Sequence, residues 1–71
     1  MNNKEVASKL ITARGSKQQK AAAKELGITQ SALAMYESGE RMPRDEIKER
    51  IAAYYGTTVG ALFFNEKVYT A

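Results

Sequence analysis

The chain has 71 residues, of which 44% are hydrophobic and 27% are charged, and its formal net charge is +3. It has no cysteine, no histidine and a single aspartate, which excludes disulfides, thiolate metal sites and imidazole chemistry. This composition weighs against a hydrolase, an oxidoreductase or a zinc protein, so we expect no enzymatic activity, catalytic residue, metal site or cofactor. A chain this short buries only about 60% of its extended surface, and residues 1–71 are predicted to form one small domain.

The positive charge is concentrated in the N-terminal half of the chain. Residues 1–35 hold six basic and two acidic side chains, whereas residues 36–71 hold five basic and six acidic ones. Such an asymmetry suggests a polyanionic partner, although a modestly charged, solvated surface would show the same pattern. The sequence has no apolar run of about 20 residues, as a membrane span requires, and no secretory signal. We therefore expect a cytoplasmic protein with no membrane partner and no evident small-molecule ligand.

A first helix is predicted from Asn3, its N-cap, to about Arg14, which should point outward. Val6, Leu10 and Ile11 recur at helical spacing, so they are expected to form the buried stripe of this helix.

A second helix follows after a short turn. Ser16 and Gln19 match a capping box, in which the Ser16 hydroxyl accepts from the Gln19 backbone N–H and the Gln19 amide reaches back. A second helix capped by Ser16 is then predicted to run to Leu26. Gly27 ends it, because glycine readily takes the left-handed conformation found at helix ends. Only residues 27–29 separate this helix from the next, a length typical of a helix-turn-helix.

Residues 28–39 are predicted to form a short third helix that is exposed on one face. Thr29 is a good N-cap, and Gly39 can end the helix with a positive φ angle. Leu33 and Tyr36 lie three residues apart and share one face. We expect this face to point into the core.

The opposite face of the third helix carries Gln30, Ser31, Ala34 and Met35. These side chains are short or uncharged, whereas a face made only for water more often carries Lys and Glu. Gln pairs with adenine through two hydrogen bonds, and methyl groups contact thymine, so all four are candidate contacts with base edges. The alternatives are that Gln30 is an ordinary polar first-turn residue and that Met35 fills a gap at the edge of the core.

Two more helices complete the predicted fold. A fourth helix should run from about Arg44 to Tyr55, and Thr58 should cap a short fifth helix over about residues 59–64. The core of the domain is then expected within residues 4–64.

A recognisable set of residues runs through the chain in a fixed order, namely Gln19, Leu26, Gly27, Ile28, Thr29, Gln30, Ser31, Leu33, Glu37, Ser38, Gly39, Arg41 and Pro43. This set resembles the Cro/C1-type helix-turn-helix family, also called the Xre family, of phage-repressor-like transcription regulators. Each residue type alone is weak evidence, but the ordered set of spacings is fairly specific, and the resemblance covers nearly the whole chain.

The resemblance implies an all-α fold, a compact five-helix bundle of the lambda-repressor-like DNA-binding type. Residues 19–26 and 30–38 would form the helix-turn-helix, and residues 30–38 would be the recognition helix. The turn from Ser38 to Arg41 would lie along the DNA backbone. The resemblance also implies a protein of bacterial or phage origin.

Within this family, the Gln that matches Gln19 contacts phosphate, and the positions that match Gln30, Ser31 and Met35 face base edges. Many relatives carry polar or basic residues where this chain has Ala34 and Met35. Direct hydrogen-bonded readout would therefore depend mainly on Gln30 and Ser31, with apolar contacts from the other two.

The candidate phosphate contacts are polar or basic side chains near the helix-turn-helix, and they comprise Lys17, Gln19, Lys20, Thr29, Ser38, Arg41 and Arg44. The alternative for the cations is simple solvation, and the alternative for Gln19 is a capping role alone. Glu37 would repel phosphate, so it is expected to be structural, with Arg41 or Arg44 as its partner.

These observations predict a transcriptional regulator, a repressor, that binds double-stranded DNA sequence-specifically and acts by occupying its operator. One recognition helix reads only a few base pairs, so a homodimer is expected, with contacts from Phe64 and from Val68 and Tyr69 in the C-terminal tail of residues 65–71. The alternative is a protein-interaction module that keeps the helix-turn-helix scaffold, binds a regulatory protein partner and has no sequence-specific DNA binding, since fold does not fix function.

Overall fold

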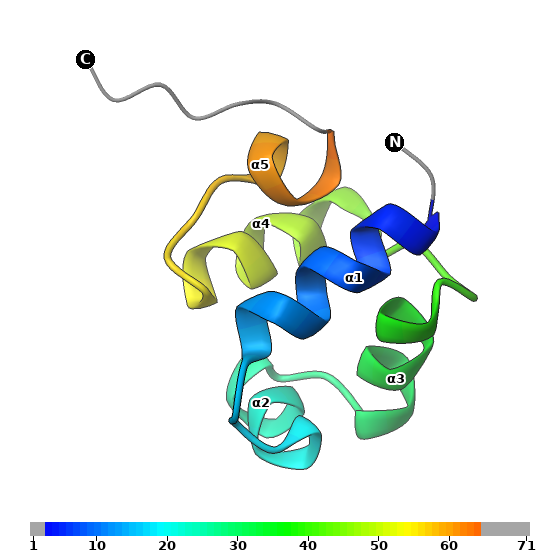
Figure 1. The fold of residues 1–71 in the computed structure, drawn as a ribbon. Helices are drawn as coiled ribbons and strands as arrows, with labels where there is room; N and C mark the ends of the chain where they lie inside the picture. The colour runs from blue at the N-terminus through cyan, green and yellow to red at the C-terminus, as the bar shows by residue number, and fades with distance from the viewer. Residues whose placement is uncertain (1–2, 65–71) are drawn as a thin grey trace.

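The computed structural model describes residues 3–64, and these form five α-helices (Figure 1). In chain order they are α1 (Asn3–Arg14), α2 (Gln19–Leu26), α3 (Gln30–Ser38), α4 (Asp45–Tyr54) and α5 (Val59–Phe63). The predicted all-α bundle, with α2 and α3 as the helix-turn-helix, is confirmed. None of the helices in the described part of the chain is long and apolar enough to cross a membrane.

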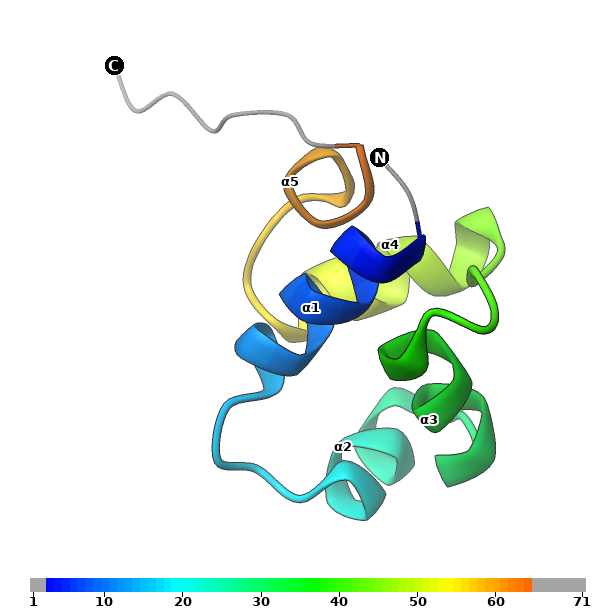
Figure 2. The ribbon, with the colours of Figure 1, turned by 45° about the vertical axis from the view of Figure 1, so that its right-hand side comes forward.

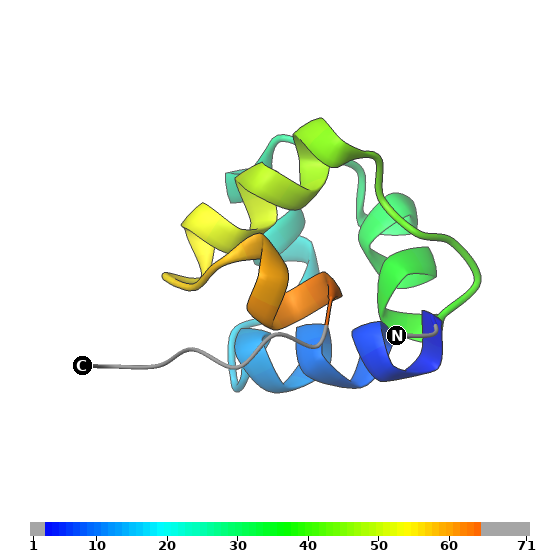
Figure 3. The ribbon, with the colours of Figure 1, turned by 90° about the horizontal axis from the view of Figure 1, so that it is seen from above.

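Helix α1 is the element against which the two ends of the bundle pack. It contacts α3 on one side and α5 on the other, while α4 contacts α2 and α5. Figures 1 and 2 show α2 and α3 side by side at the end of the molecule away from α5. Seen from above in Figure 3, α3 lies beside the N-terminal half of α1, and α5 lies between α1 and α4. The helix-turn-helix is therefore held by α1 and α4 from behind.

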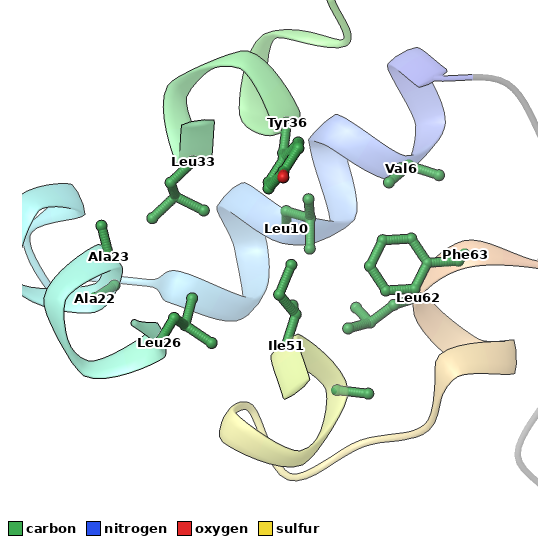
Figure 4. Packing of buried hydrophobic residues seen from close by; sticks show 11 residues of the cluster. Val6, Leu10, Ala22, Ala23, Leu26, Leu33, Tyr36, Ile51, Leu62 and Phe63 are labelled. Carbon is green, nitrogen blue, oxygen red and sulfur yellow. The ribbon is translucent and has the colours of Figure 1, made fainter. Parts of the chain in front are cut away.

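The core forms where these helices meet. Leu10 of α1, Leu33 of α3 and Ile51 of α4 are completely buried. Figure 4 shows their side chains converging between the helices, together with Phe63 from α5. Each fully buried Leu or Ile side chain stabilises the fold by about 1.5–3 kcal/mol relative to an exposed one. The inward face predicted for α3 is confirmed, because Leu33 is 0% and Tyr36 only 8% exposed.

The buried stripe of α1 is narrower than predicted. Val6 and Leu10 are buried as expected, and Ala7 joins them, but Ile11 is 47% exposed. The prediction for Ile11 was therefore wrong. Successive residues of a helix are about 100° apart, and α3 and α5 cover the face of α1 that carries Val6, Ala7 and Leu10. Ile11 lies beyond the edge of that face.

The start of α2 also differs from the prediction. The helix begins at Gln19, Gln18 is its N-cap in extended backbone, and no side chain caps it. The capping box between Ser16 and Gln19 was therefore wrong. The turn before α2 is closed instead by Arg14, whose Nη1 donates to the Lys17 carbonyl oxygen at 2.6 Å, and the Gln19 amide makes a tertiary contact described below.

The turn between α2 and α3 ends α2 as predicted. Gly27 takes a φ angle of +74°, and the backbone N–H of Ile28 donates to the Ala23 carbonyl at 3.0 Å, a pattern that satisfies free carbonyls at a helix end. Arg50 of α4 donates from Nη1 to the Leu26 carbonyl at 3.1 Å. The helix-turn-helix angle is thus fixed both locally and by α4.

Both ends of α3 follow their predicted signals. The Thr29 Oγ1 accepts from the Ala32 backbone N–H at 3.0 Å, so the predicted N-cap is confirmed. Gly39 ends the helix with a φ of +81°, and a Cβ placed there would lie 3.3 Å from the Asn3 carbonyl oxygen. Glycine is required at this position both for its backbone conformation and for close packing against the start of α1.

Of the three residues expected at the dimer contact, Phe64 lies within the part of the chain that the structure describes. Phe64, directly after α5, is 55% exposed, whereas Leu62 and Phe63 belong to the core. The Lys48 ammonium lies 4.9 Å from the centroid of the Phe64 ring. Val68 and Tyr69 lie outside the described residues.

Leu33→Ala is expected to lower the free energy of unfolding by about 2–5 kcal/mol, because truncating a fully buried Leu loses contacts and leaves a cavity. Ile11→Ala is the matched control, since Ile11 is half exposed, and its effect should stay within about 0.5 kcal/mol. Urea denaturation followed by circular dichroism measures both values. Equal effects of the two substitutions would contradict the inward orientation of α3.

Candidate nucleic-acid interface

The outer face of α3 is uncharged in the structure, as the sequence indicated. Gln30 and Ser31 in the first turn are exposed, whereas Ala34 and Met35 are half-buried. The face therefore presents two hydrogen-bonding side chains at the N-terminal end of the helix and two apolar ones behind them. An α-helix fits the major groove of B-DNA, and these side-chain types are able to contact base edges there.

Gln30 is linked to the interior through a chain of hydrogen bonds. Its Nε2 donates to the Gln19 Oε1 at 3.5 Å, the longest link, and the Gln19 Nε2 donates to the Glu37 Oε1 at 3.1 Å. Gln19 opens α2 and Glu37 lies in the last turn of α3, so the chain joins the two helices of the helix-turn-helix. Gln19 is half-buried and Gln30 is exposed, which leaves the outer end of the chain open to a ligand.

Glu37 and Arg14 form a largely buried ion pair. The Arg14 Nε donates to Glu37 Oε2 at 2.9 Å and Nη2 donates to Oε1 at 3.0 Å, and the two side chains are 19% and 4% exposed. Hydrogen bonding to the Glu37 carboxylate raises the pKa of Arg14 above its ordinary value. This ion pair supports the structural role expected for Glu37. The expectation that Arg41 or Arg44 would be its partner was wrong, and so was the expectation that Arg14 would point outward. The C-terminal end of α1 reaches Glu37, whereas Arg41 and Arg44 lie in the loop beyond α3.

Three exposed cations lie close in the chain to the ends of the helices around α3. Lys20 follows Gln19 in the first turn of α2, Arg41 follows the end of α3, and Arg44 is the N-cap residue of α4. All three are exposed, and within residues 3–64 their side chains form no ion pair or hydrogen bond. The backbone N–H of Arg41 donates to the Met35 carbonyl at 3.3 Å, which keeps this residue close to the outer face.

Lys17 has a different environment from the other three cations. Its ammonium donates to Glu25 Oε1 at 2.6 Å and to the Tyr54 hydroxyl at 3.0 Å, and the Tyr54 hydroxyl in turn contacts Glu25. Hydrogen bonds from Lys17 and Tyr54 lower the pKa of Glu25. These contacts tie the loop before α2 to α2 and α4. A phosphate contact by Lys17, which stays a prediction, would require the ammonium to leave these partners.

The two hydroxyl candidates both take part in the ends of α3. Thr29 accepts the capping hydrogen bond described above and keeps its own proton free. Ser38 donates from Oγ to the Met35 carbonyl at 3.1 Å and accepts from the Glu40 backbone N–H at 3.4 Å. Thr29 thus keeps a free donor for phosphate, whereas the Ser38 proton is engaged.

The ion pair with Arg14 is the main feature that the sequence reasoning missed. Glu37 follows Leu33 by four residues, so helical spacing already placed it on the inward face of α3. A carboxylate on a buried face is almost always paired. The sequence therefore signalled a buried partner for Glu37, although not which cation it would be.

Comparison with known proteins agrees with this geometry. A protein-family model described as Helix-turn-helix matches residues 9–62, which include the second half of α1, all of α2, α3 and α4, and most of α5. No curated protein and no solved structure gives a match to the chain.

Proposed function

Because the chain belongs to the Cro/C1-type helix-turn-helix (Xre) family of DNA-binding regulators, we propose that it binds a specific operator with α3 in the major groove. Gln30, Ser31, Ala34 and Met35 face the base edges in this proposal. Bound protein represses transcription by occupying DNA that polymerase needs. No catalytic step is involved.

One observation carries this proposal most directly. The exposed, uncharged face of α3 belongs to a helix-turn-helix that also carries Lys20 in α2 and is followed in the chain by Arg41 and Arg44, and these three exposed cations have no side-chain partner within residues 3–64. Phosphate contacts position a protein on DNA, and base contacts specify the sequence. An uncharged outer face of α3 for base contacts, together with nearby cations for phosphate contacts, fits this distinction.

The first turn of α2 adds a further phosphate site. Gln18 supplies no side-chain cap, so the first backbone N–H groups of α2 remain available. Together with the helix dipole, such N–H groups attract phosphate. Lys20 lies in the same turn, and Gln19 joins this turn to α3 through Gln30.

Selection of bound sequences from a random pool of double-stranded DNA tests the proposal. On the selected site, Gln30→Ala is expected to cost about 1–3 kcal/mol of binding free energy, because a paired base edge is lost. On random DNA it should cost little. Arg41→Ala, the matched control at a phosphate position, should weaken binding to both DNAs about equally.

Equal losses on both DNAs for Gln30→Ala would show that Gln30 does not read a base. No enrichment above background would instead favour the alternative function, a protein-interaction module on the same scaffold. The exposed Phe64 beside α5 would then be the first surface to test for a protein partner.

DNA binding is expected to weaken steeply with salt. If Lys20, Arg41 and Arg44 each neutralise one phosphate, log K against log salt should have a slope of about −3 per bound protomer, at about −0.9 per phosphate. Titrations at several salt concentrations, followed by fluorescence anisotropy, measure the slope.

Arg41→Ala should make this slope shallower by about 1. If the Lys17 ammonium of the wild-type protein stays on Glu25 when DNA binds, Lys17→Ala should leave the slope unchanged. The two variants together therefore decide whether Lys17 contacts phosphate. A slope near zero for measurable DNA binding would contradict the arrangement.

We also propose that the working form is a homodimer on a two-fold symmetric operator, with Phe64 in the contact and with Val68 and Tyr69 added from the tail. Sedimentation with and without the selected operator should find two protomers per duplex, on half-sites about 34–36 Å apart. Phe64→Ser should weaken binding of the second protomer, and Ile11→Ser, at the other exposed large hydrophobic residue within residues 3–64, should not. Saturation by one protomer on a site without dyad symmetry would overturn the dimer.

A further inference from the structure

We propose that a cavity between α1 and α5 binds a small organic acid, whose carboxylate pairs with Lys9 and whose apolar part packs against Tyr55 and Leu62. The site is separate from the outer face of α3, so the inference goes beyond the proposed DNA binding and does not depend on it. No small-molecule ligand was evident in the sequence, because the residues that line this cavity meet only in the folded chain.

The cavity lies where α5 packs beside α1, an arrangement that Figure 3 shows from above. Its walls come from residues 8–13 of α1, from the end of α4 and the turn after it, and from α5. It has a volume of about 320 Å³ and is open to solvent. Pockets that bind small molecules range from about 300 to 1,000 Å³. This cavity is therefore accessible, and its size suits only a small ligand.

The ammonium of Lys9 is held in place at this cavity. It donates to the Ala61 carbonyl oxygen at 2.9 Å, and the Lys9 side chain is half-buried. Carbonyl groups in the last turn of a helix lack partners within the helix, so this hydrogen bond satisfies a free carbonyl of α5 and also fixes the ammonium. An ammonium has three N–H donors. Two of them remain for a ligand.

The charge of the cavity favours an anion. Lys9 is the one charged residue in its lining, which contains no acidic side chain within the described part of the chain. Ser8, Thr12 and Thr57 add three hydroxyl groups, each of which is able to donate a hydrogen bond. Hydrogen bonds between an ammonium and a carboxylate are about twice as strong as those between neutral groups. A carboxylate bound here would have both a cation and neutral donors around it.

The rest of the lining is apolar and points to a ligand with a hydrocarbon part. It consists of the methyl groups of Ala13 and Ala61, the side chain of Leu62 and the ring of Tyr55. The Tyr55 hydroxyl is buried and has no hydrogen-bond partner within residues 3–64. Because Tyr55 as a whole is only half-buried, the side-chain surface that it offers to a ligand is the ring. An inorganic anion would leave this apolar surface uncovered, whereas an aromatic acid would cover it with a second ring.

Benzoate is the probe that tests the site, in a titration followed by the backbone amide signals of the ¹⁵N-labelled protein. The signals of residues 8–13, Thr57 and Ala61 should shift together and saturate, with a Kd on the order of 1 mM for a ligand this small. Benzamide has the same shape without the charge, and inorganic phosphate has charge without the ring. Both should bind at least about fivefold more weakly than benzoate.

Substitutions at Lys9 separate its charge from its packing. Lys9→Met keeps the length of the side chain and removes the ammonium, so benzoate should bind about tenfold more weakly, as expected for the loss of a hydrogen bond between charged groups. Lys9→Arg keeps a cation and should restore most of the affinity. Lys4→Met is the matched control, because it removes an exposed positive charge from the same helix, and it should change the Kd by less than about twofold. Urea denaturation confirms that each variant is folded. If Lys9→Met does not fold, the comparison of benzoate with benzamide on the wild-type protein decides.

Each contrary outcome is distinct. Equal binding of benzoate and benzamide would overturn the carboxylate contact, and equal binding of benzoate and phosphate would overturn the apolar part of the site. The absence of saturable shifts at the cavity, or shifts that map to the outer face of α3, would overturn the site itself. None of these results bears on operator binding, and a failure to bind DNA would leave the benzoate result unchanged.

Discussion

The ion pair between Arg14 and Glu37 is the interaction that connects the fold to its outer face. It joins the last turn of α1 to the last turn of α3 through two hydrogen bonds in a largely buried position. Charges removed from water are tolerated only when they are paired and hydrogen-bonded, so the two helices are held in one register. Arg14 also closes the turn before α2 through the Lys17 carbonyl. One guanidinium therefore fixes α3 from behind and sets where α2 begins.

Only one of the two faces of α3 supports the fold through apolar burial. Leu33 and Tyr36 point into the core, and their burial supplies apolar stabilisation of a kind that does not depend on what the helix binds. Gln30 and Ser31 are exposed, and no apolar packing depends on them. Such a division allows the outer face to carry uncharged side chains without cost to the fold.

Local rules predicted the parts of the structure that are decided locally. The cap at Thr29, the left-handed Gly39 and the inward Leu33 each follow from residues within one or two turns, and all three are confirmed. The capping box at Ser16 failed because Gln19 has a stronger partner, the charged carboxylate of Glu37, which only tertiary packing brings within reach. The partner of Glu37 could not be read from the sequence for the same reason, since 23 residues separate it from Arg14. The uncharged outer face of α3 could be predicted from composition, whereas the internal pairing of Lys17 depends on the position of α4 and could not.

The hydrogen bonds from Gln30 to Gln19 and from Gln19 to Glu37 distinguish Gln30 from its neighbour Ser31 on the outer face of α3. The Ser31 side chain forms no hydrogen bond with residues 3–64, and a hydroxyl both donates and accepts, so this hydroxyl is free to bond either a donor or an acceptor. Gln30 is coupled through Gln19 to a charge that is itself needed for the fold. A substitution at Gln30 therefore removes a side-chain hydrogen bond to the first residue of α2, whereas a substitution at Ser31 removes none within residues 3–64. Adjacent residues of the same helix turn are thus subject to different physical constraints, since one is coupled to the buried ion pair and the other is not.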